Sequence, residues 1–440
     1  MTRAIALFGV ISLLTALTAC GTGTDVSTDE DPAILQVPEE HETISAAVRA
    51  AEPGDLVLVS PGVYREEVHV ATEDVTVRGT ERDEVVIDGE GVRPSGIVAT
   101  ADGVRIENLT VQETTFYGVL VTGLHDESGP AAPAVDDYER FDPAEFPPVE
   151  RFGVSHVTAA NNGLYGIYAF HAQHGYVTDS YASGSADSGL YVGQCRECDV
   201  LVQGNVAERN AVGFENANAS DSVVVVGNRF SGNRVGMAIL SNYQEAFTPQ
   251  HGNTVVGNVV THNDSEQSPA HAQGGFGIGI GVSGGQDNLF SRNLVTANPR
   301  AGILLTHAED LAATGNTFEQ NMFRAEDVAP NGVDIANTSA GRTPAADNCV
   351  TGASGLPTVL PDALLADCSG RQPATGAGEL PSPEIPPGMS FLQVPAPPPQ
   401  HSMDDAERVP DRLPATTAIP DLDSVEVPPP DFLAERSGRP

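Results

Sequence analysis

Tyrosine and carboxylate side chains are concentrated in one stretch of this sequence, residues 163–218. Five of the nine Tyr lie there, together with Asp187 and Glu215. Tyr168, Tyr191 and Glu215 each follow a glycine of a recurring pattern by two residues. Aromatic faces and carboxylates are typical partners of sugar rings, and two neighbouring carboxyls can act as general acid and base. The stretch therefore predicts a groove that binds a carbohydrate, with or without processing it.

Within this stretch we predict Asp187 and Glu215 as the catalytic acid and base, which requires both carboxyls on one face, roughly 5–9.5 Å apart. The core is the alternative location for the tyrosines, because alternate residues of a strand point inward. The side chains predicted to contact the substrate are Tyr168, Tyr191, Gln194, Arg196 and Glu208. We predict no metal or cofactor: Ca²⁺ is considered for the acidic loop around Asp136, Asp137 and Glu139, which lacks a D-x-[DN]-x-[DN]-G pattern.

A short unit recurs along the middle of the chain: apolar-x-x-Asn-x-apolar, with a second Asn five residues on. Successive copies are 23 residues apart from 205 to 228 and again from 293 to 316. Longer steps contain polar insertions at 243–250 and 264–274. The first positions are Asn205, Asn228, Asn258, Asn293 and Asn316, and the second are Asn210, Asn233, Asn263, Asn298 and Asn321.

This repeat predicts the fold. Short β-branched runs broken by Asn and Gly are typical of strands separated by tight turns. A period near 23 residues with about three strands per unit matches one coil of a right-handed parallel β-helix, whereas a β-propeller blade needs about 40–45 residues. Like residues stack in such a solenoid, so we expect hydrogen-bonded ladders of Asn. With strands about 4.8 Å apart, Tyr168, Tyr191 and Glu215 should form one vertical row.

The two ends of this all-β solenoid differ in composition. Thr43 precedes a run of good helix formers, which predicts a short N-terminal capping helix that covers the open first coil. From about residue 372 the chain is rich in Pro and acidic side chains, and such a segment cannot bury enough apolar surface to order itself. The predicted domains are a single-stranded right-handed parallel β-helix over 41–371 and a disordered Pro-rich acidic tail over 372–440.

Residues 1–19 combine a positive charge at Arg3 with an apolar run that is shorter than the roughly 20 residues needed to cross a bilayer, which indicates an export signal. The signal ends in Leu-Thr-Ala-Cys-Gly, which resembles the bacterial lipobox. The resemblance implies lipidation of Cys20, a tether over 20–40, and a location on the outer face of the cell membrane. Outside the cytoplasm the other cysteines are expected to form disulfides. The expected pairs are Cys195 with Cys198 and Cys349 with Cys368.

The charge balance excludes several classes of partner. The 440 residues include 22 basic against 60 acidic side chains, a formal net charge of −38, and every basic residue is Arg. A nucleic-acid partner is excluded because phosphate would be repelled. A lysine Schiff base is excluded because the chain has no Lys. The same negative charge disfavours a polyanionic glycan.

Two parts of the sequence resemble known families. The segment 44–91, with Pro-Gly-Asp at 53–55 and Val-Thr-Val-Arg-Gly at 75–79, resembles the opening of the pectin-lyase-like superfamily. Three strings at 163–168, 186–194 and 205–216 are similar to the uncharacterised bacterial parallel β-helix repeat family with GIYVGQ and GIEIEN motifs. Together the similarities span about residues 41–340. They imply a β-helix and no particular reaction.

Wider relatives in that superfamily include pectate lyases, uronate epimerases and the accessory protein for copper loading of nitrous oxide reductase. A Ca²⁺-dependent lyase needs an Arg or Lys base, for which Arg196 and Arg209 are the close candidates. The epimerase Asp-Pro-His motif is absent from the sequence, and the 5 Met are scattered rather than clustered for copper. Two functions are therefore carried forward. One is an envelope lipoprotein whose groove binds a glycan, with or without processing it by lyase, hydrolase or epimerase chemistry. The other is a non-catalytic scaffold or accessory protein that binds an envelope protein partner.

Overall fold

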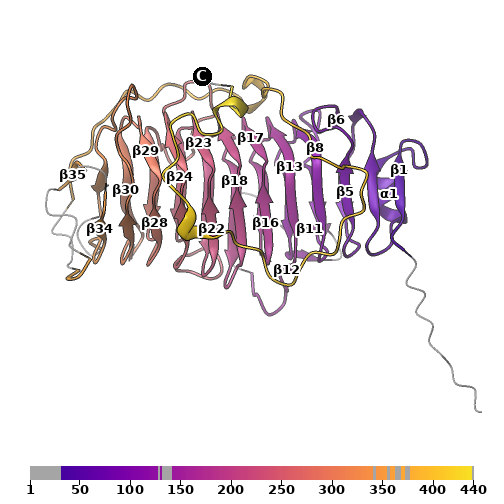
Figure 1. The fold of residues 1–440 in the computed structure, drawn as a ribbon, viewed down its shortest axis with the longest axis horizontal. Coiled ribbons are helices and arrows are strands. Elements are labelled where there is room, and N and C mark those ends of the chain that lie inside the picture. Colours follow the sequence, from indigo (N-terminus) through magenta and orange to yellow (C-terminus); the bar gives the residue numbers. More distant parts are fainter. Residues whose placement is uncertain are drawn as a thin grey trace, which may run out of the picture. The chain divides into compact units, whose positions relative to one another are not determined.

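The computed structural model describes residues 31–126, 129–130, 141–339, 343–353, 357–361, 368–371 and 377–438. The chain divides into a short unit, residues 1–31, and a unit of residues 32–440 that contains the described secondary structure. In the larger unit the strands stack coil upon coil in parallel (Figure 1). The predicted parallel β-helix is therefore confirmed.

Most strands belong to two sheets, here called sheet A and sheet B, whose long ladders are parallel. Sheet A contains β1 (Ile34–Val37), β2 (Leu56–Val59), β3 (Gly62–Tyr64), β5 (Thr76–Gly79), β6 (Val85–Asp88), β8 (Arg105–Gln112), β13 (Gly153–Ala160), β16 (Gly175–Thr178), β17 (Tyr181–Ser183), β19 (Val200–Gln203), β20 (Val206–Glu208), β22 (Val223–Val226), β23 (Arg229–Ser231), β25 (Thr254–Val256), β26 (Val259–Thr261), β28 (Leu289–Ser291), β29 (Leu294–Thr296), β32 (Thr317–Glu319) and β34 (Cys349–Thr351). Sheet B contains β4 (Val68–Val70), β7 (Ser95–Ala99), β9 (Tyr117–Thr122), β14 (Tyr165–Phe170), β18 (Ser188–Cys195), β21 (Val212–Ala219), β24 (Val235–Leu240), β27 (Ile278–Ser283), β30 (Ala301–Ala308), β31 (Leu311–Ala312), β33 (Ile335–Asn337) and β35 (Val359–Leu360). Two small pairs are β10 (His125–Asp126) with β11 (Gly129–Pro130), and β12 (Val149–Glu150) with β15 (Ala172–Gln173).

Sheet A is bent and supplies two of the three faces of a coil, while sheet B supplies the third. Strands β8 and β13 run through the bend, so that β13 pairs with both β16 and β17. At the bend of three successive coils the backbone has positive φ, with values of 67°, 61° and 64° at Gly204, Gly227 and Gly257. Glycine adopts this left-handed conformation without a Cβ clash. The predicted use of Gly at the turns is confirmed at these corners.

Buried asparagines stack along the corners of the solenoid. In one ladder each Nδ2 donates to the Oδ1 of the next coil at 2.9–3.0 Å, through Asn205, Asn228, Asn258, Asn293 and Asn321. A second ladder runs through Asn210, Asn233, Asn263, Asn298 and Asn331 at 3.0–3.2 Å. Because each Oδ1 also accepts a backbone N–H of the preceding coil, the ladders fix the register between coils. The predicted ladders are confirmed.

Two predicted ladder members were wrong: Asn316 does not stack on Asn293, and Asn321 joins the ladder of Asn293 rather than that of Asn298. Strand β28 pairs with β32 so that Leu289 lies opposite Thr317. As a result Asn316 stacks on Asn288, 28 positions earlier, at 3.0 Å, and it donates in turn to Asn348. The 23-residue step from Asn293 to Asn316 is a coincidence of sequence, because a similar Asn motif occurs at two corners of the same coil.

The N-terminal cap and the disulfides agree with their predictions. Helix α1 (Ile44–Ala50) begins after Thr43, whose Oγ1 accepts the Ala46 N–H at 3.1 Å. Ile44 and Val48 of this helix join the hydrophobic core that fills the coils. The predicted pairs Cys195–Cys198 and Cys349–Cys368 are both bonded. Cys20 and the acidic loop at 136–139 lie outside the described residues.

Residues 377–438, here called the strap, lie against the outside of the solenoid (Figure 1). Apart from three 3-10 turns, η1 (Phe391–Gln393), η2 (Leu422–Ser424) and η3 (Ala434–Arg436), they contain no regular element. Guanidinium groups of the solenoid donate to strap carbonyls, namely those of Arg78, Arg82, Arg105, Arg209, Arg229, Arg234 and Arg292. The strap is thus held through its backbone by side chains of many coils.

The Arg229 contact illustrates this attachment. Its Nη1 donates to the carbonyls of Pro430 and Phe432 at 2.8 and 3.1 Å. A guanidinium offers five N–H donors in one plane, so a single side chain can hold two carbonyls of an extended segment. The end of the strap is also fixed by a carboxylate, because Glu208 accepts the Gly438 N–H at 2.8 Å.

The described part of the predicted tail, residues 377–438, has no strands or α-helices, but it contacts the solenoid. The lack of strands and α-helices in this segment agrees with its Pro-rich composition. However, Leu422 and Val425 pack on an apolar patch of sheet A that includes Leu201 and Val224. Composition predicts only what the apolar groups of the tail itself can bury. Apolar and arginine groups that the solenoid supplies to the tail were not visible in the sequence.

A ladder position should be far more sensitive to truncation than an exposed amide. Asn258→Ala removes the Oδ1 that accepts both the backbone N–H and the Nδ2 of Asn228. Leaving buried donors without an acceptor costs about 1–3 kcal/mol each. We expect a fall of about 2 kcal/mol or more in the free energy of unfolding, measured by urea denaturation. The exposed control Gln267→Ala should change it by about 0.5 kcal/mol or less. Equal effects would contradict a structural role for the ladder.

Loss of one guanidinium should loosen the strap locally. Arg229→Ala removes the donors to Pro430 and Phe432. Hydrogen bonds to charged groups contribute about 1.5–3 kcal/mol, so amide exchange within 428–438 should accelerate about tenfold or more in a mass-spectrometric measurement. Arg408→Ala is the matched control, because that side chain is 73% exposed and pairs with exposed Asp411. Unchanged exchange in Arg229→Ala would show that the arginines do not hold the strap.

Candidate functional site

The outer face of sheet B carries the predicted row of side chains. Pairing of β14, β18 and β21 places Tyr168 opposite Tyr191, and Tyr191 opposite Glu215. The next positions in this row are Ala238 and Gly281. Because Ala and Gly leave space where the previous coils have tyrosine rings, the row opens into a cavity beside Glu215.

This cavity has a volume of about 340 Å³. The polar lining residues are Asp187, Glu215, Ser241, Asn242, His271, Gln273, Ser283 and Thr306. The remaining lining residues are Val235, Ala238, Leu240, Gly275, Ile278, Gly281 and Leu304. Three parts of the chain contribute: the strands of sheet B, the segment after β24, and the insertion at 264–274. The site therefore combines a rigid floor with walls made by loops.

The two predicted carboxyls meet at one hydroxyl. Ser188 Oγ lies 3.2 Å from Asp187 Oδ1 and 2.5 Å from Glu215 Oε2. A hydroxyl donates one hydrogen bond at a time, so it can donate to one carboxylate while it accepts from the other carboxyl in protonated form. Both carboxyls therefore line one cavity and are linked through the Ser188 hydroxyl.

Burial gives both carboxyls pKa values above those of exposed Asp and Glu side chains. Burial raises the pKa of Asp187 to about 6, while the hydrogen bond from Ser188 opposes the shift. Burial also raises the pKa of Glu215 well above its usual value, and the charges of Asp187 and Glu245 raise it further. Each carboxyl therefore keeps its proton to a higher pH than an exposed carboxyl does. An ionised carboxylate next to a protonated one is the arrangement that general acid–base catalysis requires.

His271 supplies a neutral ring to the cavity wall. Its Nδ1 accepts the Gly275 N–H at 2.8 Å, so the neutral ring carries its proton on Nε2. Burial, and then the charge of Arg234, lower the pKa of His271 to about 4. Arg234 itself lies over the Phe276 ring, with 5.5 Å between its Cζ and the ring centroid. His271 therefore offers a hydrogen bond and no charge at neutral pH.

The structure corrects the role predicted for the tyrosines. Tyr168 and Tyr191 are only 3% and 2% exposed. Their rings meet edge to face with centroids 4.6 Å apart, and both join an outer apolar cluster with Tyr117 and Phe170. The row exists, but its rings are packed against each other. They form a wall behind the carboxyl pair and present little surface to a sugar.

Three other predicted contacts lie outside the cavity lining. Gln194 is fully buried, and its Oε1 accepts the Ala246 N–H at 3.2 Å, which positions the loop after β24. Glu208 belongs to sheet A, where Tyr181 donates to it at 2.6 Å and the strap is anchored. Arg196 is exposed beside the Cys195–Cys198 turn. The three residues do not share the cavity because a linear stretch of sequence visits all three faces of the solenoid.

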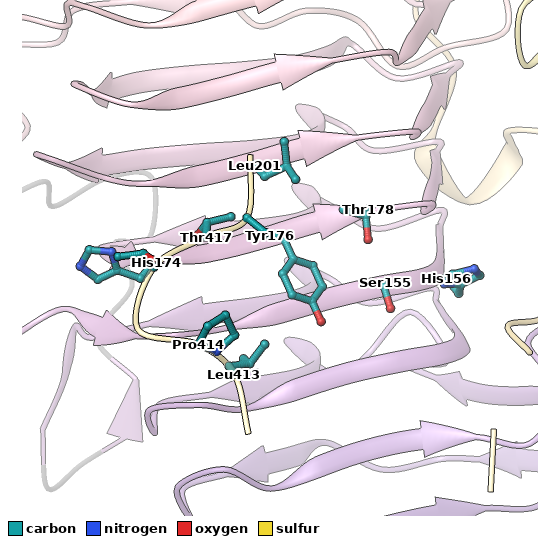
Figure 2. Close-up of a pocket in the computed structure, with 11 residues that line it drawn as sticks. Ser155, His156, His174, Tyr176, Thr178, Leu201, Leu413, Pro414 and Thr417 are labelled. Atoms are coloured by element: carbon teal, nitrogen blue, oxygen red, sulfur yellow. The ribbon is translucent and has the colours of Figure 1, made fainter. Parts of the chain in front are cut away.

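A second cavity lies between sheet A and the strap. It has a volume of about 350 Å³ and is lined by Tyr176 and Leu201 of the sheet and by Leu413, Pro414 and Thr417 of the strap. Figure 2 shows the Tyr176 ring between the strands and the strap residues. The Thr417 N–H donates to Asp199 at 2.7 Å and fastens the strap beside this cavity. Its lining includes His156 and His174 but, among the described residues, no carboxyl group.

The site contains residues that the sequence did not reveal. Ser188 and His271 were not predicted, although Ser188 is adjacent to Asp187. One sequence feature could have indicated the cavity: after Glu215 the row continues with the small residues Ala238 and Gly281.

Within the described ranges, no three His, Cys, Asp or Glu side chains gather as a metal site would require. No helix of the described chain has the length and apolar character of a membrane span.

The buried carboxyls should weaken the fold at neutral pH. The folded pKa of Asp187, about 6, exceeds its unfolded value of about 3.9. The folded state therefore binds more protons than the unfolded state between these values, and stability falls as pH rises through this range. We expect Asp187→Asn and Glu215→Gln to melt a few degrees higher than the wild type at pH 7.5, with the gain of Asp187→Asn vanishing near pH 4. The exposed control Glu73→Gln should show no such difference. A lower melting temperature at pH 7.5 would contradict the assigned burial cost.

A family model described as periplasmic copper-binding protein (NosD) matches residues 50–273 and 156–344. Several solved structures are similar. The A-module of the mannuronan C-5 epimerase AlgE4 from Azotobacter vinelandii has 15% identity and a TM-score of 0.42, over 72% of this chain and 90% of that one. An alginate lyase from Paenibacillus sp. str. FPU-7 has 11% identity and a TM-score of 0.40, over 74% and 97%. The Dettilon tailspike protein has 13% identity and a TM-score of 0.47, over 73% and 62%.

These structural similarities are at low identity, and the parallel pairing of the strands establishes the β-helix independently. The family match is broader, because its first segment alone covers more than half of the 440 residues. The protein therefore belongs to the family described as periplasmic copper-binding protein (NosD).

Proposed function

We propose that the cavity on sheet B binds a carbohydrate and that Asp187 and Glu215 act on it as an acid–base pair. The observation that carries the proposal is the position of Ser188 Oγ, within 3.2 Å of both carboxyls at the cavity wall. Polar lining groups such as Asn242 and Gln273 suit sugar hydroxyls, and the apolar side of the cavity suits the C–H face of a ring.

The closeness of the two carboxyls favours a double-displacement route. Retaining glycosidases have carboxyls about 5–5.5 Å apart, whereas inverting enzymes need about 6.5–9.5 Å for an intervening water. Asp187, ionised above pH 6, would attack the anomeric carbon as the glycosidic C–O bond breaks. Protonated Glu215 would give its proton to the leaving oxygen. Water would then cleave the glycosyl ester, with Glu215 taking up the water proton.

A non-catalytic accessory role is the second candidate. It is favoured by the description of the matched family, which names binding rather than catalysis. In that case the sheet B face would bind a glycan or an envelope protein partner without turnover. The copper named in the family description has no matching donor cluster among the residues that the structure describes. We therefore derive no step through copper.

Export and anchoring complete the proposal. The signal-like residues 1–19 and the lipobox-like sequence around Cys20 support a lipid anchor at the outer face of the cell membrane. The matched family is described as periplasmic, which agrees with export. Metabolic labelling with a fatty-acid analogue should label the wild type and leave Cys20→Ser unlabelled. Labelling of both would refute lipidation at this cysteine.

Removal of either carboxyl should abolish turnover more than binding. The full-length protein in mild detergent is first screened on a glycan array. Each glycan that binds is then tested for hydrolysis by measuring the reducing ends released. We expect Asp187→Asn and Glu215→Gln to lower kcat by about 10²–10⁴-fold. In Ser188→Ala, loss of the hydrogen bonds that lower both pKa values should move both limbs of the pH profile upward. Binding without turnover would favour the accessory role, and no binding to any glycan would contradict the proposal.

A further inference from the structure

The charge of the sheet B cavity limits its ligand. Its ionisable lining residues among those described are Asp187, Glu215 and His271. No arginine lines it in the described part of the chain, although arginines are frequent on the strap side of the solenoid. The sequence contains no Lys at all. The cavity therefore has no positive group that could pair with a carboxylate or phosphate of a ligand.

Neighbouring groups strengthen this negative character. Glu245, on the segment after β24, is 5% exposed, and its charge acts on Glu215. His271 stays neutral because its Nδ1 is used by the Gly275 N–H and the ring is buried. Arg234 acts on His271 from behind the wall but does not line the cavity. The charged groups that face the carboxyl pair are thus acidic.

We propose that the carbohydrate taken by this cavity carries a free, protonated amine that pairs with the carboxyls of Asp187 and Glu215. The inference rests on the proposed carbohydrate function and names its substrate class: a glycan that contains unacetylated amino sugar. An amine on the carbon next to the glycosidic carbon lies within reach of the same two carboxyls that would act on that bond. A positive charge there offsets the cost of burying carboxylates in a cavity of low polarity.

The same charge pattern sets the order of affinity among sugars. A uronic acid would bring a third carboxylate to the acidic cavity and is rejected. An N-acetylated sugar keeps the shape but loses the charge, so it should bind more weakly than the free amine. An ammonium beside ionised Asp187 offsets the charge of that carboxylate and leaves the proton of Glu215 for the leaving oxygen, whereas a neutral sugar offers no such pairing.

The test uses the full-length protein in mild detergent and isothermal titration calorimetry at pH 6.5. The probes are β-1,4-linked glucosamine tetramer, its fully N-acetylated counterpart and galacturonate tetramer. We expect the free amine to bind at least tenfold more tightly than the acetylated tetramer, and galacturonate not to bind.

Variants separate the cavity from general attraction to an acidic surface. The double variant Asp187→Asn, Glu215→Gln should lose the preference for the amine, while the exposed control Glu73→Gln should keep it. Circular dichroism and melting temperature verify that each variant is folded. A preference that persists in the double variant would overturn the inference, as would equal binding of the amine and the acetylated sugar. Equal binding of the amine and the acetylated sugar would leave the proposed carbohydrate function intact. If no sugar bound, including those on the array, both the proposed function and this inference would be contradicted.

Discussion

The hydrogen bond from one asparagine side chain to the next, repeated coil after coil in the core, is the constraint on which the remaining structure depends. Each ladder amide donates to the following Oδ1 and accepts the backbone N–H of the preceding coil. Register in a parallel sheet is critical, because a slip of one residue moves every side chain to the other face. Only with this register do Tyr191 and Glu215 lie opposite each other and the cavity open at Ala238.

Arginine and acid are divided between the two sides of the solenoid. On the strap side, guanidinium groups of the coils hold carbonyls of residues 377–438, as Arg78 does with Ala406 and Arg408. This use of a planar donor suits arginine better than lysine. On the sheet B side, two carboxyls are buried together without a cation in the cavity lining. Natural proteins accept such local cost at functional sites and recover the stability elsewhere, here in the ladders and the strap.

Much of the architecture was predictable from the sequence because it depends on repetition. The Asn spacing predicted the β-helix and the ladders, and Thr43 predicted the cap of α1, since these are local patterns. The error at Asn316 arose where two corners share one motif. Glu208 and Gln194 were misplaced because their faces depend on where each strand bends. The path of the strap and the position of His271 in the cavity wall depend on contacts between distant segments, which composition and local pattern do not encode.

The proposed function depends on Asp187 and Glu215 sharing a proton in the cavity of sheet B. An NMR titration of the side-chain carboxyl carbons of Asp and Glu, with Asp187→Asn and Glu215→Gln for assignment, tests it directly. We predict that the Asp187 carboxyl titrates near pH 6, that the Glu215 carboxyl titrates well above its ordinary range, and that each substitution alters the titration of the other residue. Two independent titrations near pH 4 would contradict the account, because carboxyls that ionise separately in that range are neither buried together nor coupled.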